Sequence, residues 1–287
     1  MSSIPATFRA YRYQAYGAPD QVLELRSDVP QAPLAPTQVR VKVHSAAINP
    51  VDVKLTTGHE RGLLSESPTS SKPFGIGFDG AGTVVEVGSA VHKDGDGALH
   101  VGDAVYFMTS FSTFGSFAEY LTVDQSYQAL VEHAKLQKGE RVLILGGSSA
   151  TGIYAIQIAK AVGAHVTTTA SARNTAFVKS LGADQVIEYT TTRWIEALPP
   201  HSIDVLYDCG IEPNAWNSDA QTVLRKDTGR FVTLLSIADP KAASKHGAKL
   251  VGSILVYPSA SHLTELTRLI EDGKIVTPID SVHRFEN

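Results

Sequence analysis

A run of seven small residues is the feature of this sequence best suited to binding chemistry. The run, GGSSATG, follows the apolar stretch VLIL and leads into the helical pattern IYAIQIAKAVG. A strand, a tight turn and a helix together place backbone N–H groups where a pyrophosphate can bind, and larger side chains would hold that ligand away. The spacing predicts that a dinucleotide contacts this turn through Gly147, Ser148, Ser149, Ala150, Thr151 and Gly152.

The turn differs from the usual dinucleotide fingerprint, G-x-G-x-x-G. Gly147 and Gly152 stand at the first and third glycine positions, but Ser149 stands at the middle one. A structural turn without any ligand would use similar residues. That alternative stays open on the turn alone.

The end of the next predicted strand indicates which dinucleotide binds. The strand HVTTTAS ends at Ser171 and is followed closely by Arg173. NAD sites place an acidic side chain there to hold the ribose hydroxyls, whereas a 2′-phosphate needs a hydrogen-bond donor and a cation. No acidic residue lies between Ala170 and Lys179. Ser171 and Arg173 are therefore candidates for the 2′-phosphate of NADPH, although Arg173 would also suit an ordinary solvated surface.

The elements that must position these residues fall into two regions. Over residues 1–127, short β-branched or alternating apolar runs are separated by Gly, Pro and Asp clusters, which indicates a β-rich domain. Over residues 128–275, apolar strands alternate with segments of helical period. That alternation is typical of βαβ units and a parallel sheet.

Composition narrows the class of protein. The 287 residues carry 25 basic and 29 acidic side chains, well mixed, so neither a polyanion-binding surface nor a nucleic-acid partner is expected. The single cysteine, Cys209, excludes an intramolecular disulfide and a zinc lobe with four cysteine ligands, and it is expected to fill space at a buried strand end. No apolar run approaches the roughly 18 residues that cross a bilayer. With no signal-peptide pattern either, we expect a cytoplasmic protein without membrane partners.

Several longer stretches resemble one known family. They are NPVDVKLTTG (49–58), GFDGAGTVVEVG (77–88), VGDAVY (101–106), GSFAEY (115–120), LQKGERVLILGG (136–147) and KSLGADQVIEY (179–189). In this order they are similar to the zinc-free quinone oxidoreductases, the zeta-crystallin-like branch of the medium-chain dehydrogenase/reductase superfamily. The resemblance implies an α/β fold, with a GroES-like β-rich catalytic domain and a doubly wound Rossmann domain for the cofactor. Residues 276–287 would begin a return to the catalytic domain.

The resemblance also implies which residues lie beside the reacting end of the cofactor. Family members bring Asn49 and Asp52 to the nicotinamide side, where Asn49 could bind a cofactor ribose or a substrate carbonyl. Asp52 is equally suited to capping the helix that follows it. Tyr189 corresponds to a residue beside the adenosine phosphate in relatives, and it would otherwise simply pack at a strand end.

A Gly-His-Glu sequence beginning at Gly58 matches the fragment that carries a zinc ligand in zinc alcohol dehydrogenases. In those proteins the fragment lies just before the AG-x-V-x-x-VG stretch, which here is the position of Gly77, Phe78 and Asp79. Phenylalanine thus replaces the ligand, and the expected cysteine ligand would fall near Asn49, where none exists. We therefore expect no metal and interpret the early fragment as a coincidence.

The combined pattern predicts a reductase that uses NADPH to deliver hydride to a quinone or an α,β-unsaturated carbonyl compound. An enoyl-thioester reductase and a non-catalytic NADPH-binding protein, crystallin-like or regulatory, stay open as alternatives. A short-chain dehydrogenase is excluded because no tyrosine is followed by lysine four positions later, and a serine hydrolase because GGSSATG is not G-x-S-x-G. A homodimer or homotetramer is expected.

By the same resemblance, the chain lacks two segments of its relatives. One is a strand and helix after GSFAEYLTV, where DQSYQALVEHAKL follows directly here. The other is a helix and strand beyond VHRFEN. Either the chain is a shortened variant or residues are missing from the sequence. The second alternative predicts a break between Asp124 and Gln128, with a Cα–Cα distance well above the roughly 3.8 Å of a trans peptide.

Overall fold

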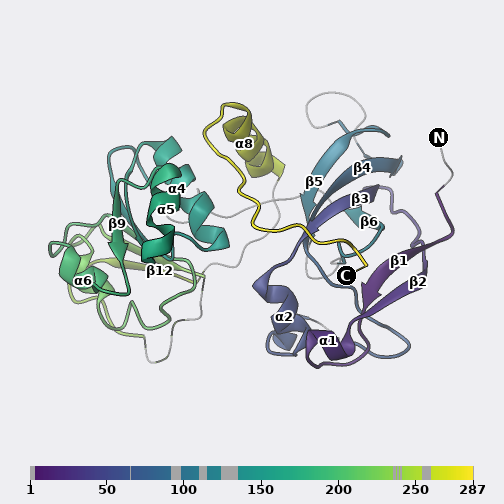
Figure 1. The fold of residues 1–287 in the computed structure, drawn as a ribbon, viewed down its shortest axis with the longest axis horizontal. Helices are drawn as coiled ribbons and strands as arrows, with labels where there is room; N and C mark the ends of the chain where they lie inside the picture. Colours follow the sequence, from purple (N-terminus) through teal and green to yellow (C-terminus); the bar gives the residue numbers. More distant parts are fainter. Residues whose placement is uncertain are drawn as a thin grey trace. The chain divides into compact units, whose positions relative to one another are not determined.

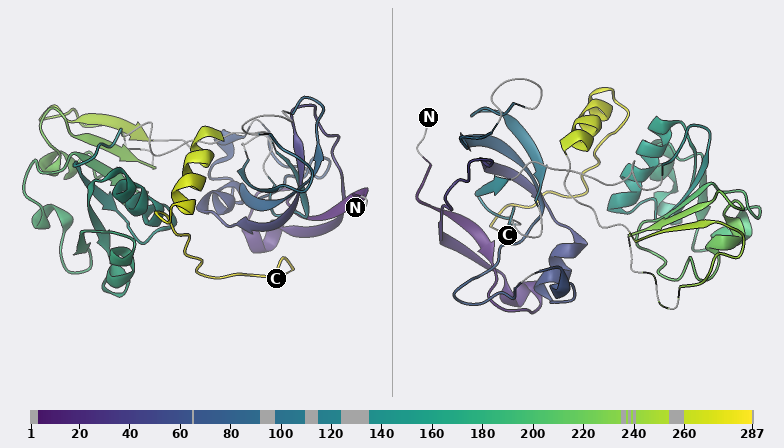
Figure 2. Two further views of the ribbon diagram at one scale, coloured as in Figure 1. Left: turned by 90° about the horizontal axis from the view of Figure 1, so that it is seen from above. Right: turned by 180° about the vertical axis from the view of Figure 1, so that it is seen from behind.

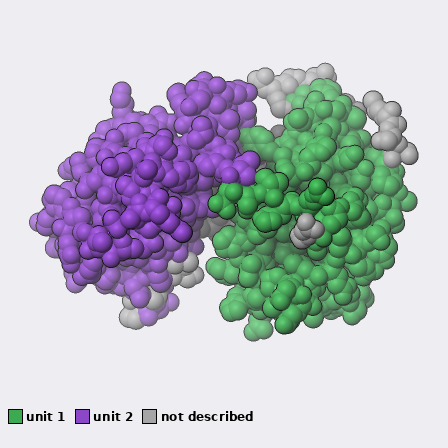
Figure 3. Space-filling view, viewed as in Figure 1, with its two compact units in different colours: residues 1–127, 257–260, 280–287 green, residues 128–256, 261–279 purple. Residues whose placement is uncertain are grey.

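The chain folds into two compact units in the computed structural model (Figures 1 and 3). The first comprises Met1–Tyr127, Tyr257–Ala260 and Asp280–Asn287, and the second comprises Gln128–Val256 and Ser261–Ile279. The structure describes residues 4–64, 66–91, 98–109, 115–123, 135–234, 237, 239, 241–253 and 260–286. The predicted break between Asp124 and Gln128 lies outside these residues. Within the described ranges, every helix is too short or too polar to cross a bilayer.

The first unit is built from antiparallel strands, as its short apolar runs predict. Its elements are β1 (Thr7–Arg12), α1 (Pro19–Val22), β2 (Glu24–Pro30), β3 (Val39–Ala47), α2 (Pro50–Thr56), the 3-10 helix η1 (Arg61–Leu63), β4 (Asp79–Val87), β5 (Ala104–Met108) and β6 (Tyr120–Val123). β1 pairs with β2, and a second sheet has the order β5-β4-β3-β6. Val41 and Val84 are fully buried in its core and cluster with Phe107.

The last described residues of the chain pack on β1 of the first unit. The ring of Phe285 meets that of Tyr11 edge-on, with 5.5 Å between centroids, and the guanidinium of Arg9 lies 5.6 Å from the Phe285 ring. The Tyr11 hydroxyl donates to the carbonyl of Phe285 (3.1 Å), and Arg9 pairs with Glu286 (2.9 Å). One strand therefore holds this segment through an aromatic and a charged contact.

The second unit is a six-stranded parallel sheet with helices (Figures 1 and 2). Its elements are β7 (Arg141–Leu145), α4 (Ala150–Val162), β8 (His165–Ala170), the 3-10 helix η2 (Ala172–Asn174), α5 (Thr175–Ser180), β9 (Gln185–Glu188), α6 (Trp194–Ala197), β10 (Val205–Asp208), α7 (Ala220–Val223), β11 (Arg230–Thr233), β12 (Lys249–Ser253) and α8 (Ala260–Glu271). The strand order is β12-β11-β10-β7-β8-β9, so the chain starts at the centre and winds outward in both directions. This is the doubly wound order of dinucleotide-binding domains, and the predicted Rossmann-type sheet is confirmed.

Both faces of this sheet are covered by helices, and the side chains of β7 point alternately to one face and to the other. Val142 and Ile144 belong to one buried cluster, with residues of α4 and α5. Leu143 and Leu145 belong to the other, with residues of α6 and α7. A strand buried on both sides explains the uninterrupted apolar run VLIL in the sequence.

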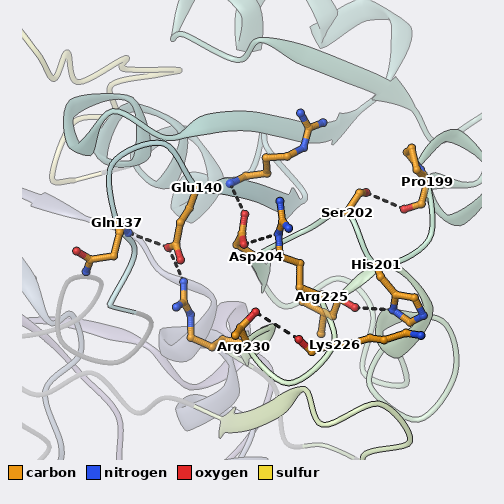
Figure 4. Close-up of polar contacts among 12 residues, drawn as sticks. Gln137, Glu140, Pro199, His201, Ser202, Asp204, Arg225, Lys226 and Arg230 are labelled. Atoms are coloured by element: carbon orange, nitrogen blue, oxygen red, sulfur yellow. Dashed lines mark hydrogen bonds and ion pairs between the residues drawn. The ribbon is translucent and has the colours of Figure 1, made fainter.

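Ion pairs hold the amino ends of the strands in the second unit (Figure 4). Glu140, just before β7, pairs with Arg230 at the start of β11 (2.5 Å). Asp204, just before β10, pairs with Arg225 (2.6 Å) and accepts the backbone N–H of Arg141 (2.9 Å). Ligands of such sheets bind at the opposite, carboxyl ends. These charges therefore serve the fold rather than the cofactor.

A buried glutamine on α4 fixes the segment that follows α8. Gln157 is only 4% exposed. Its Nε2 donates to the carbonyls of Ile153 (3.0 Å) and Val276 (3.0 Å), and its Oε1 accepts the N–H of Val276 (2.7 Å). One side chain thus satisfies both backbone groups of Val276, as a neighbouring strand would.

We predict that Gln157→Leu lowers the free energy of unfolding by about 1–3 kcal/mol, because it leaves the N–H and C=O of Val276 without these partners. Urea unfolding followed by circular dichroism measures the change. Gln21→Leu, on the exposed side of α1, is the matched control and should stay within about 0.5 kcal/mol of the unmodified protein. Equal stability of the two variants would show that Gln157 contributes nothing to the fold.

Candidate functional site

The small-residue turn joins β7 to α4 at the centre of the parallel sheet. α4 begins at Ala150, and Ser149 is its N-cap, whose hydroxyl accepts the N–H of Gly152 (3.0 Å). The prediction that the helix opens after Gly152 was wrong. A serine N-cap satisfies one of the N–H groups that a helix start leaves unpaired, so it begins the helix earlier.

Two glycines of the turn are required by the packing of the chain itself. A Cβ added to Gly152 would lie 2.1 Å from the carbonyl oxygen of Gly146, and one added to Gly147 would lie 2.1 Å from Oγ1 of Thr168. Gly146 also has a φ of +85°, which side chains disfavour. These glycines would be needed even if no ligand were bound, so they do not by themselves indicate a cofactor.

The backbone N–H groups of the turn are more informative. The N–H of Gly146 donates to Oγ1 of Thr169, and the N–H of Gly147 donates to the carbonyl of Thr169, both at 2.9 Å. Those of Ser148, Ala150 and Thr151 have no hydrogen bond within the described part of the chain. Unpaired N–H groups at the start of a 13-residue helix form a site for an anion, and the helix dipole adds to it. This part of the chain fits the pyrophosphate of a dinucleotide.

The ends of β8 and β9 bring the remaining candidates to the same edge of the sheet. Ser171 follows β8 directly, and Arg173 lies in the adjoining η2. Arg173 is exposed and makes no ion pair among the described residues. Tyr189 follows β9, is 60% exposed, and donates its N–H to the carbonyl of Ala170 (3.3 Å). The parallel register thus gathers Ser171, Arg173 and Tyr189 next to the end of β7.

Asn174 connects these strand ends, a role that no sequence pattern predicts. Its Nδ2 donates to Oγ of Ser148 (3.0 Å), which ties η2 to the small-residue turn. The contact joins residues 26 positions apart. No motif marks the asparagine, because its role depends on the pairing of β7 with β8.

Asp208 is a second residue that sequence reasoning missed. It ends β10, is fully buried, and accepts hydrogen bonds from the N–H groups of Ile211 (2.9 Å) and Glu212 (3.2 Å) and from Oγ1 of Thr233 (2.9 Å). It therefore shapes the loop after β10, whose Ile211 side chain lies against Gly146. The signal available was an acid closing the apolar run VLYD.

Cys209 lies in the same loop as a buried thiol. Its side chain is 8% exposed. Burial, with a smaller contribution from the charge of Asp208, raises the pKa of its thiol to about 12. A thiol with so high a pKa is neutral at physiological pH and is a poor nucleophile. Cys209 fills space, as expected.

In the first unit, Asp52 acts as a helix cap. It is the third residue of α2, and its Oδ2 accepts the N–H of Asn49, the N-cap (2.7 Å). Its Oδ1 accepts the N–H of Gly77 (3.1 Å), and the side chain is 2% exposed. Both carboxylate oxygens are thus bound to backbone groups. This geometry favours the capping alternative over a role in contact with ligands.

Asn49 instead contacts Asp79, the first residue of β4. The distance from Nδ2 of Asn49 to Oδ2 of Asp79 is 2.5 Å. Phe78, which stands where zinc members carry a ligand, is 4% exposed. His59 of the early Gly-His-Glu sequence is exposed and lies 2.8 Å from Oγ1 of Thr57. In the described ranges no three His, Cys, Asp or Glu side chains are grouped to hold a metal ion, and a metal-free site stays a prediction.

Burial makes the carboxyl groups of Asp52 and Asp79 weaker acids than usual. It raises the pKa of Asp52 to about 6, against the opposing effect of the two backbone hydrogen bonds. The nearby charge of Asp79 contributes in the same direction as burial. Burial also raises the pKa of Asp79, and the hydrogen bond from Asn49 opposes that shift. Burial also raises the pKa of the Tyr13 phenol, and the charge of Asp52 contributes in the same direction.

We predict a pH-dependent stability difference between the protein and its Asp52→Asn variant. The folded-state pKa of about 6 lies above the unfolded value of about 3.9, so ionisation of Asp52 lowers the free energy of unfolding as pH rises through this window. The asparagine of the variant cannot ionise in this pH window. From pH 4 to 7 its stability should therefore improve relative to the unmodified protein by about 2–3 kcal/mol. Urea unfolding at several pH values measures this, and a difference that does not vary with pH would contradict it.

Comparison with known proteins covers nearly the whole chain. Residues 35–154 match the family described as alcohol dehydrogenase GroES-like domain, and residues 181–287 match that described as zinc-binding dehydrogenase. The 2-methylene-furan-3-one reductase of Solanum lycopersicum is 31% identical over 97% of this chain and 73% of its own length. The chloroplastic NADPH-dependent alkenal/one oxidoreductase of Arabidopsis thaliana is 33% identical, with the same coverage. The first alignment extends over 309 residues, more than the 287 of this chain, so that relative has residues without a counterpart here.

Solved structures agree with the sequence relatives. The quinone oxidoreductase of Coxiella burnetii superposes with a TM-score of 0.78 at 27% identity, over 96% of this chain and 90% of its own. An alcohol dehydrogenase superfamily protein of Novosphingobium aromaticivorans gives 0.76 at 26% identity, over 93% and 88%. The fold, the order of its motifs and these relatives lead to one conclusion: the chain belongs to the medium-chain dehydrogenase/reductase superfamily, in its quinone oxidoreductase branch.

Proposed function

We propose that this protein is an NADPH-dependent reductase that transfers hydride to a quinone or an α,β-unsaturated carbonyl compound without using zinc. The observation that carries the proposal is the set of unpaired N–H groups at the start of α4, with Ser171 and Arg173 on the neighbouring strand end. Relatives named as an alkenal/one oxidoreductase and a furanone reductase support the substrate class. So does the solved quinone oxidoreductase.

The second unit would hold the nucleotide through charge and backbone dipoles. The N–H groups of Ser148, Ala150 and Thr151 suit the pyrophosphate. Ser171 would donate a hydrogen bond to the 2′-phosphate and Arg173 would pair with its charge. Tyr189, with its ring exposed, would lie beside the adenosine. When bound, the reduced nicotinamide supplies the hydride.

The first unit would contribute orientation and a dry environment. Asn49 presents a carboxamide at the start of α2, and Ile48 (73% exposed) and Val53 (47% exposed) lie near it in the sequence. Exposed apolar side chains next to a fixed polar group are suited to exclude water around a reacting ring. We propose that Asn49 contacts the nicotinamide end, whereas Asp52 supports it from inside the fold.

We predict that the purified protein oxidises NADPH when offered a quinone or an enone, and that a chelator leaves the rate unchanged. Loss of the absorbance of the reduced nicotinamide measures the rate across a panel of a quinone, an alkenal and an enoyl thioester. Turnover of the thioester alone would instead identify an enoyl-thioester reductase. Tight NADPH binding without any turnover would identify a non-catalytic binder, and inactivation by the chelator would overturn the zinc-free mechanism.

We predict that Arg173→Ala removes most of the preference for NADPH over NADH. Charge-assisted hydrogen bonds of about 1.5–3 kcal/mol correspond to a preference of roughly ten- to a hundredfold. Calorimetric titration with both nucleotides should show weaker NADPH binding and nearly unchanged NADH binding. Arg193→Ala, in the same unit but paired with Asp219 (2.7 Å), is the matched control. Equal affinity of the unmodified protein for both nucleotides would rule out the 2′-phosphate site.

We further propose that the protein works in the cytoplasm as a homodimer or homotetramer, with a small molecule as its substrate. The Arabidopsis relative is named as chloroplastic. Cell fractionation and light scattering of the purified protein would test the compartment and the oligomeric state directly.

A further inference from the structure

Two histidine rings meet at the amino ends of the parallel strands in the second unit. His201 lies shortly before β10 and His246 shortly before β12, and the centroids of their rings are 4.8 Å apart, with an angle of 71° between the ring planes. His201 also contacts the loop before β11, which carries Arg225 and Lys226 (Figure 4). Ligands of such sheets bind at the carboxyl ends of the strands. The two rings therefore lie outside the proposed cofactor site.

A hydrogen bond fixes the His201 ring and leaves one of its nitrogens for another partner. Nδ1 lies 2.8 Å from the carbonyl oxygen of Leu224. A carbonyl only accepts, so Nδ1 carries the proton and Nε2 of the neutral ring carries a lone pair. Histidines that bind metals usually donate their second ring N–H in this way. Among the described residues, Nε2 has no hydrogen-bond partner.

The backbone beside both rings has an uncommon conformation. Positive φ angles among the described non-glycine residues occur at Lys135, His201 and Asp227, with values of +54° for His201 and +61° for Asp227. The N–H of Asp227 donates to the carbonyl of His246 (2.9 Å), so the two loops meet here. Such angles persist where the surrounding structure fixes them. The rings are thus presented by loops of defined conformation.

The distance between the rings suits two ligands of one metal ion. An imidazole nitrogen about 2.0–2.1 Å from a metal places the ring centroid about 3.2 Å from it, and two such rings at an angle of about 90–110° have centroids about 4.5–5.2 Å apart. The observed 4.8 Å lies in this range. His246 is exposed and has no hydrogen bond from its ring within the described part of the chain. Its ring can therefore turn a nitrogen toward His201 at little cost.

The charges around the rings and the number of ligands decide how tightly an ion can bind. Lys226 opposes a cation, but the carboxylate of Asp227 lies beside His246, since a Cβ added to Gly247 would be 2.2 Å from its Oδ1. The described residues offer no group of three ligands. Two imidazoles and water make a weak, exchangeable site, and imidazole suits Cu²⁺, Ni²⁺ and Zn²⁺, of which Cu²⁺ binds most tightly.

We propose that His201 and His246 together bind one divalent transition-metal ion through their imidazole nitrogens, with Cu²⁺ held more tightly than Ni²⁺ or Zn²⁺. The ion has no part in the proposed hydride transfer, because the rings lie at the opposite ends of the strands from the proposed cofactor site. The proposal therefore does not depend on the proposed function, and a zinc-free reductase can carry this second site.

Equilibrium dialysis of the untagged protein against each of the three ions tests the site. His246→Phe keeps a ring against His201 but removes the nitrogens, and His201→Asn keeps a residue type that tolerates a positive φ. Each variant should weaken Cu²⁺ binding by about tenfold or more. The double variant should lose little beyond either single one, because one imidazole alone holds the ion poorly. His59→Ala, on an exposed histidine of the first unit, is the matched control and should bind as the unmodified protein does.

Four outcomes would overturn the proposal. They are unchanged Cu²⁺ binding in His201→Asn or in His246→Phe, an equal loss in the His59→Ala control, tighter binding of Zn²⁺ than of Cu²⁺, or an ion located away from the two rings by anomalous scattering from a crystal soaked in Cu²⁺. An ion between the two rings in that crystal would support the site. Circular dichroism of each variant checks that a loss of binding does not come from unfolding.

Discussion

The close approach of α4 to the end of β7 is the constraint on which the second unit depends. With no side chain at Gly152, the first turn of the helix can lie against the carbonyl of Gly146. That approach lets Ile153 and Ile156 bury themselves in the cluster shared with β7 and β8. It also places at the centre of the sheet three N–H groups that have no partner among the described residues. Packing and the anion site therefore have the same cause, and a larger residue at Gly152 would disturb both.

In the first unit, backbone hydrogen bonds hold the polar groups at the start of α2. At the positions where zinc relatives are expected to carry ligands, this chain has a buried phenyl ring and an amide–carboxylate pair. Asp52 on α2 accepts the N–H of Gly77. Gly77 has a φ of +94°, which side chains disfavour, and a Cβ added there would collide with Ser116. Burial of Asp52, with a smaller contribution from the charge of Asp79, raises the pKa of Asp52 and makes its contribution to stability depend on pH.

Local sequence patterns predicted the strands of the parallel sheet. The polar contacts around the candidate site depend instead on residues that lie far apart in the sequence. Apolar runs located the strands of the parallel sheet because each run is bounded by turn residues. The start of α4 was missed by three residues, because the hydrogen bond from the N–H of Gly152 to the Ser149 side chain starts the helix before the glycine. Asn174, Asp208 and Asp79 escaped notice because their partners lie 25 to 30 positions away or on another strand. The roles of Asn49, Arg173 and Tyr189 depend on a bound ligand, so neither the sequence pattern nor the fold tests them.

The burial of Cys209 has a consequence for the survival of the protein among its proposed substrates. Quinones and enones are electrophiles that add to thiolates. Burial raises the pKa of Cys209 to about 12, so its side chain is protonated at pH 7. The chain has no second cysteine. The cysteine of this sequence is therefore a poor target for the electrophilic acceptors on which the protein is proposed to act.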